Sequence, residues 1–167
     1  MGFFDSLFGI KRIPKIASIL PFSAKQEIQA GRLPILNTDK LFLKKGEKIH
    51  YIDKAIHLEI KKKKVYKHVG HSSPGLLKGN RWSSGVATPT EYDELVQHRG
   101  ILYVTNQRIV FQSPETGFDK AYRYLTTLQP YTDACVLQFG NKSYNMYVED
   151  GNILYQVLQL IQQRRIP

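Results

Sequence analysis

Residues able to perform chemistry are few in this sequence and do not form a catalytic group. The pair His68 and His71 has no carboxylate or thiol cluster beside it that would complete a metal site. The single cysteine, Cys135, lies in the apolar run ACVLQF, a setting typical of a buried and unreactive thiol. No serine stands in a nucleophile-elbow pattern, and no glycine spacing matches a phosphate-binding loop. We therefore expect no enzyme activity, no catalytic residues, no metal and no cofactor.

Positive charge is the main chemical feature, and it is concentrated in one part of the chain. The formal net charge is +10, and residues 40–81 contain twelve Lys or Arg against three acidic residues. A local positive field attracts phosphate on lipid, on nucleic acid or on a small ligand. We predict an anion-binding or lipid-binding role for the densest cluster, which comprises Lys61, Lys62, Lys63, Lys64 and Lys67. The alternative is a solvated, charged edge strand that discourages aggregation.

An apolar helix is predicted at the start of the chain. On a helical wheel the apolar side chains fall within one arc, which includes Phe3, Phe4, Leu7 and Phe8. A helix this short is not stable alone in water, so it must dock on something. Either a membrane interface or a protein surface, on this chain or another, fits the pattern. The start MGFFDS also matches the permissive myristoylation pattern.

The cellular setting is predicted from what interrupts the apolar stretches. Asp5, Lys11 and Arg12 break the first apolar stretch, which excludes a cleavable signal peptide. One cysteine cannot form an internal disulfide, and no apolar run reaches the length of about 18 to 20 residues that crosses a bilayer. We expect a cytoplasmic protein, either free or peripheral at the inner membrane face.

Two further helices are predicted. Residues 23–31 begin with a capping-box pattern, Ser23 with Gln26, and end at Gly31. Residues 151–165 form an amphipathic helix that Asp150 can cap, with two arginines at its end. Its apolar face contains Ile153, Leu154, Val157, Leu158, Leu160 and Ile161.

Most of the remaining chain is predicted to form short antiparallel strands. Residues 48–60 are read as a first strand, which runs into a lysine-rich region and a return strand within residues 61–69. Residues 71–95 are read as loops with one short strand at 81–87. Residues 101–105 and 108–112 form a hairpin around Asn106 and Gln107, and their continuous apolar character indicates that both faces are covered. Short strands follow within residues 119–128, 134–140 and 143–148, with a turn at 140–142.

These elements predict a mainly β protein with helices, of the α+β class. A lone amphipathic helix after a curled antiparallel sheet must bury its apolar face against an open side of that sheet. We expect an antiparallel barrel of about seven strands closed by the C-terminal helix. Residues 1–40 are predicted as a helical extension and connector, and residues 41–167 as the domain.

The central segment resembles the pleckstrin-homology-like superfamily, closest to its GRAM and bacterial PH branches. The matching positions are Gly100, Leu102, Tyr103, Thr105, Asn106, Arg108, Ile109 and Phe111, with the entry KKGE at residues 44–47. The resemblance covers roughly residues 42 to 164. It implies a PH-like barrel that binds lipids, peptides or protein partners without catalysis, and a basic first hairpin that contacts anionic headgroups.

The expected function is that of a non-enzymatic PH-like or GRAM-like adaptor. It would bind a protein partner or an anionic membrane surface through the basic hairpin and the N-terminal helix. One alternative is an oligomerising interaction module in which that helix docks on another chain. Another is a nucleic-acid-binding module, in which Arg81 and Trp82 provide phosphate and stacking contacts beside Lys78, Tyr66 and His68.

Overall fold

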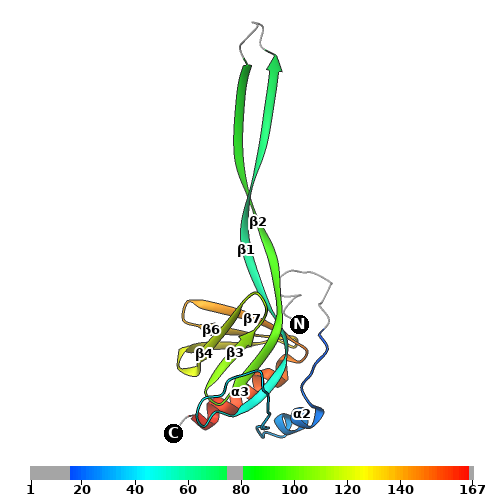
Figure 1. Ribbon diagram of the computed structural model, residues 1–167, viewed down its shortest axis with the longest axis vertical. Helices are drawn as coiled ribbons and strands as arrows, with labels where there is room; N and C mark the ends of the chain where they lie inside the picture. Colours follow the sequence, from blue (N-terminus) through cyan, green and yellow to red (C-terminus); the bar gives the residue numbers. More distant parts are fainter. Residues whose placement is uncertain (1–15, 75–80, 166–167) are drawn as a thin grey trace. The chain divides into compact units, whose positions relative to one another are not determined.

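The protein is mainly β with helices, as a computed structural model that describes residues 16–74 and 81–165 shows (Figure 1). Within this part, the side chains of residues 65–89 are also left undescribed. The elements in chain order are α2 (Phe22–Gln29), β1 (Ile49–Pro74), β2 (Arg81–Thr105), β3 (Arg108–Gln112), β4 (Gly117–Ala121), a 3₁₀ turn (Tyr122–Tyr124), β5 (Leu125–Pro130), β6 (Ala134–Phe139), β7 (Lys142–Val148) and α3 (Gly151–Arg165).

The strands form one seven-stranded sheet in the order β4-β3-β2-β1-β7-β6-β5. Its registered pairs are antiparallel, as expected for a meander. Contacts across the interior show that the sheet curls over its own core. Phe118 on β4 stacks on Tyr144 of β7 with ring centroids 4.2 Å apart. Phe118 also lies 6.2 Å from the ring of Phe139 on β6. Strands far apart in the sheet order therefore face each other across the interior.

The central hairpin is covered on both faces, as its sequence predicted. Leu102 and Phe111 belong to the main core, together with the buried faces of α2 and α3. Tyr103 and Val110 point to the opposite face, where Leu41 and the half-buried Leu36 cover them. The segment between α2 and β1 is thus a second layer on the outside of the sheet.

The closing helix α3 is confirmed together with its N-cap. Asp150 accepts hydrogen bonds through Oδ1 from the backbone N–H of Asn152 at 3.0 Å and of Ile153 at 3.3 Å. The predicted apolar face is buried, except that Leu160 is only half-buried. The helix begins at Gly151, where a Cβ would lie 2.1 Å from the carbonyl oxygen of Tyr131. A glycine is therefore needed for the helix to start this close to the sheet.

The short helix α2 exists, but its predicted start was wrong. Pro21 is the N-cap and no side chain caps the helix, so Ser23 lies inside it and forms no capping box. The predicted glycine stop is confirmed, because Gly31 has φ +83° and Arg32 N–H donates to the carbonyl of Glu27 at 2.9 Å. A proline at the start can replace a side-chain cap because it removes one unsatisfied donor and sets φ.

The path of the lysine-rich segment also differs from the prediction. β1 is a single strand of 26 residues, so the lysine-rich region is part of this strand, and the return strand predicted within residues 61–69 was wrong. β2 has 25 residues and includes most of the segment predicted as loops. Residues 60–96 of these two strands form a compact unit of their own, called here the ribbon. Alternation of apolar and polar residues cannot predict such strands, because that pattern arises only where one face of a strand pair is buried.

Residues 16–36 pack with the sheet in the other compact unit. Asp53 on β1 accepts hydrogen bonds from Ser18 Oγ and from the backbone N–H of Ile19, both at 2.7 Å. Leu20 and Ile28 are buried in the main core. The predicted docking residues Phe3, Phe4, Leu7 and Phe8 lie outside the described residues. Within the described part, none of the helices combines the length and apolar character needed to cross a bilayer.

Candidate functional site

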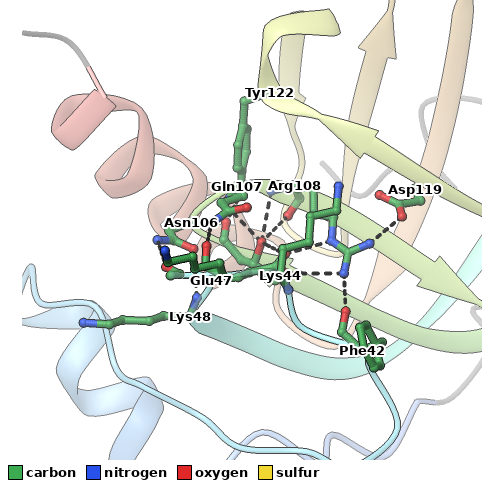
Figure 2. Close-up of polar contacts among 12 residues, drawn as sticks. Phe42, Lys44, Glu47, Lys48, Asn106, Gln107, Arg108, Asp119 and Tyr122 are labelled. Carbon is green, nitrogen blue, oxygen red and sulfur yellow. Dashed lines mark hydrogen bonds and ion pairs between the residues drawn. The ribbon is translucent and has the colours of Figure 1, made fainter.

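The turn between β2 and β3 is fastened to the residues that precede β1. Asn106 accepts a hydrogen bond from the backbone N–H of Lys48 at 2.8 Å and donates to the carbonyl of Gly46 at 3.1 Å. Gln107 donates through Nε2 to the carbonyl of Lys45 at 3.0 Å. Two segments about sixty positions apart in the chain are thereby held together (Figure 2). Asn106 and Gln107 are thus explained by their hydrogen bonds to the backbone of residues 45–48.

Arg108 and Glu47 form a buried ion pair beneath this turn. Arg108 donates through Nε to Glu47 Oε1 at 2.8 Å, and both residues are only 7 % exposed. The same guanidinium donates to the carboxylate of Asp119 and to the carbonyl of Phe42 (Figure 2). Thr105 adds a hydroxyl hydrogen bond to Glu47 at 2.8 Å. Four of the five N–H donors of the guanidinium therefore have a protein acceptor.

The protonation states fit a structural role for this network. Burial acts to raise the pKa of Glu47, but hydrogen bonds from Arg108, Lys44 and Thr105 outweigh it and lower that pKa below its ordinary value. The hydrogen bond to Glu47 raises the pKa of Arg108. Both groups stay charged and paired at neutral pH. Since most of their donors and acceptors are used within the protein, we interpret the network as one that holds the residues before β1 against β3.

A second polar cluster surrounds two buried histidines. His98 lies with Nδ1 3.0 Å from Glu115 and with Nε2 3.1 Å from Glu59. The ring of His57 lies 5.8 Å from that of His98 and packs near Phe111 and Tyr144. Burial lowers the pKa of His57. This cluster links β1, β2, β3 and β7. Sequence reasoning missed it because the two histidines are forty-one positions apart.

The lysines predicted to bind anions lie on the ribbon. Lys61 to Lys64 are all exposed, and the side chain of Lys67 is outside the described residues. Lys63 forms an ion pair with Glu94, and Lys64 lies 3.7 Å from Glu91. Successive residues of a strand point to opposite faces, so the four lysines are divided between both faces of the ribbon. The structure places them together along one strand but partly neutralises them.

The remaining chemical candidates do not assemble into a site. Cys135 is buried, and burial raises the pKa of its thiol to about 12. Such a thiol stays protonated and unreactive at neutral pH. Among the described residues, no group of three or more potential metal ligands is brought together. His68, His71, Trp82 and Lys78 have no described side chains.

Comparison with known proteins does not assign this chain to a family. No protein-family model matches the chain, and no curated protein is similar enough to be considered a relative.

Proposed function

We propose that this chain is a non-catalytic, PH-like binding module that attaches to an anionic membrane surface through the lysines of its ribbon. The curled antiparallel sheet and its closing helix support the resemblance to the pleckstrin-homology-like superfamily. The pairing of Arg108 within the protein and the burial of Cys135 support a role without catalysis.

The observation that carries this proposal is the exposure of four consecutive lysines on β1. Because these side chains are exposed, their ammonium groups can reach phosphate on an adjacent surface. Residues 60–96 hold seven basic and three acidic residues, which gives a net charge of +4. Two of the acidic residues, Glu91 and Glu94, lie beside Lys64 and Lys63. Each lysine near an anionic surface contributes about 1 kcal/mol, so a few together give reversible attachment.

Vesicle sedimentation tests the proposal. The full chain should pellet with vesicles of phosphatidylglycerol and phosphatidylcholine, and not with phosphatidylcholine alone. The variant Lys61→Gln/Lys62→Gln should weaken vesicle binding by about tenfold or more, because it removes about 2 kcal/mol of attraction. A matched control, Lys40→Gln/Lys142→Gln, removes the same charge from exposed positions outside the ribbon. Equal pelleting with both vesicle types, or equal loss in the two variants, would contradict the proposal.

The predicted N-terminal helix is tested in the same assay. Deletion of residues 1–12 should weaken vesicle binding if the phenylalanines insert at the interface. The deletion stops there because truncation at residue 40 would remove Leu20, Ala24 and Ile28 from the main core. Unchanged binding after the deletion would restrict the proposal to the ribbon.

Protein interaction is the second candidate function, and the described strand pairing favours it. The registered pairing of β1 with β7 ends at Leu58, and that of β2 with β3 begins at Ile101. A two-stranded ribbon is marginally stable alone, so strand addition by a second chain would stabilise it. Size-exclusion chromatography with light scattering tests this candidate. A monomer at every concentration would argue against self-assembly.

A further inference from the structure

A pocket of about 410 Å³ lies where four segments of the chain meet, in the compact unit that contains the sheet. Its walls come from residues 33–35, from the approach to β1, from the turn after β2 and from the last turn of α3. The lining residues are Leu33, Ile35, Gly46, Lys48, His50, Asn106, Ile161, Arg164 and Arg165. This volume is within the range of about 300 to 1,000 Å³ that is typical of small-molecule sites.

The pocket is lined by three cationic side chains and by no acidic residue. Lys48, Arg164 and Arg165 are the cations, and within residues 16–74 and 81–165 none of them forms a salt bridge. The pocket beside β3 and β4 differs in this respect, because its arginine is accompanied by Glu115 and Asp119. Within the described part of the chain, no lining carboxylate offsets the positive charge of the pocket that contains Lys48 and Arg164.

One of the three cations, Arg165, is held in position by contacts of its side chain. Its guanidinium lies 5.1 Å from the ring centroid of Tyr122 and donates to the carbonyl of Asn106 at 3.4 Å. The backbone of Lys48 accepts from Asn106 N–H at 3.0 Å, and its side chain is exposed. Its side chain extends away from the Glu47 network, as Figure 2 shows. Positioned cations lose less conformational entropy on binding than free ones.

The positive charges at the pocket also affect the buried side chain of His50, which forms part of its wall. Its side chain is 6 % exposed and its Nδ1 donates to the carbonyl of Pro34 at 2.7 Å. Burial is the main cause of its lowered pKa, and the charges of Arg164 and Lys48 lower that pKa further. A bound anion would offset those two charges.

The other part of the wall is apolar. Leu33, Ile35 and Ile161 line the pocket beside the cations, and Ile35 is 60 % exposed. An arginine guanidinium can bind phosphate through two parallel N–H···O hydrogen bonds. A pocket lined only by acidic or only by apolar side chains cannot bind phosphate in this way. Cations beside an apolar wall thus favour a ligand with both a phosphate and an apolar portion.

We propose that this pocket binds the phosphate group of a small phosphorylated ligand, with the apolar portion of that ligand against Leu33, Ile35 and Ile161. The site is distinct from the ribbon lysines and does not rest on the proposed membrane attachment. The competing explanation is that Arg164 and Arg165 only stabilise the carboxyl end of α3.

Titration calorimetry on the full chain tests the pocket with soluble probes. Dioctanoyl phosphatidic acid, glycerol 3-phosphate and inorganic phosphate are titrated separately, below the concentration at which the lipid forms micelles. At least one probe should bind saturably with one site per chain. The variant Arg164→Gln/Arg165→Gln should weaken that binding at least about tenfold, because charged hydrogen bonds are lost. The control Lys40→Gln/Lys142→Gln should bind as the wild type does.

The probes also distinguish the two sources of phosphate. Binding of glycerol 3-phosphate as tight as that of the lipid would assign the site to soluble phosphorylated molecules. Binding of the lipid alone would assign it to a headgroup with an attached chain. Absence of saturable binding by all three probes would overturn the proposal, as would equal weakening in the control variant.

A second variant covers the case in which the arginine variant unfolds. Lys48→Gln changes the pocket without touching α3, and it should also weaken binding at least about tenfold. Unchanged binding in this variant, together with lower thermal stability of the arginine variant, would show that the arginines only stabilise the helix. Because soluble probes do not require the ribbon, failure here leaves the vesicle result unaffected.

Discussion

Arg108 shows why a polar residue in an apolar strand is tolerated. Its guanidinium is buried, but Glu47, Asp119 and the carbonyl of Phe42 accept its hydrogen bonds. Taking two charges out of water costs several kcal/mol, which only a well-paired geometry offsets. The pair therefore contributes more to specifying one arrangement of β3 and the residues before β1 than to net stability.

Removal of one partner of this pair should be costly. Arg108→Met leaves the carboxylate of Glu47 buried without its main donor, so we expect a loss of about 3 to 5 kcal/mol in the free energy of unfolding. Urea denaturation followed by circular dichroism measures this loss. The double variant Glu47→Leu/Arg108→Met removes both charges and should recover part of the stability. A loss below about 1 kcal/mol in the single variant would show that the pair is hydrated.

His57 and His50 should make stability depend on pH. Burial lowers the pKa of each below the ordinary 6.5, so the unfolded chain binds protons more readily than the folded chain. Their contribution is fully present above about pH 6.5 and is lost as the pH falls through the lowered pKa of each histidine. Urea denaturation at pH 7.5 and at pH 5.5 measures the effect. His57→Gln should show a smaller decrease on acidification, and an unchanged decrease would assign the effect to other groups.

The hairpin of β2 and β3 depends on a glycine at its open end. A Cβ at Gly100 would lie 2.1 Å from the carbonyl oxygen of Gln112 and 2.9 Å from Cβ of Ser113. Backbone atoms cannot move aside as a flexible side chain can. The strands approach each other so closely at Gly100 that only a glycine fits, whereas its backbone angle is not unusual.

Gly100→Ala should consequently lower the free energy of unfolding. Overpacking typically costs about 1 to 3 kcal/mol, and contact with backbone places this variant at the upper end. Thermal and urea unfolding measure the effect. Arg99→Ala is the matched control, because Arg99 is exposed on the same strand and should change stability by less than about 0.5 kcal/mol. Equal effects of the two variants would contradict the steric explanation.

The molecule as a whole contains two units of different character. The described residues of the two apolar clusters named above come from the unit with residues 1–59 and 97–167. The described ribbon side chains, residues 60–64 and 90–96, are exposed or half-buried. Stability is expected to reside in the first unit, while the ribbon is available for binding.

Excision of the ribbon should therefore leave the first unit folded. Replacing residues 62–94 by an Asn-Gly turn joins β1 and β2 through a tight hairpin. Unfolding should stay cooperative, with a midpoint equal to or above that of the full chain, because closing a shorter loop costs less entropy. Vesicle binding through the ribbon should be lost, whereas the pocket at Arg164 should bind its probe as before. Loss of cooperative unfolding would show that the ribbon is part of the core structure.

The sequence alone was sufficient for the central hairpin, β6, β7 and α3, because their signals are local. The spacing of apolar residues, the turn at Asn106 and the N-cap at Asp150 can each be recognised within a few neighbouring residues. The path of β1 and β2 was predicted wrongly, since a solvated ribbon does not need an apolar pattern. The division at residue 40, the lysine site and the membrane role stay predictions.

Only the tertiary structure decided which charges are paired. Glu47 and Arg108 are sixty-one positions apart, and the cations of the proposed pocket come from the approach to β1 and from the end of α3. Composition counts a lysine or an arginine in the same way whether or not a carboxylate lies beside it. The strength of an electrostatic interaction depends on distance and burial, and both follow from how the sheet curls and where the last helix ends.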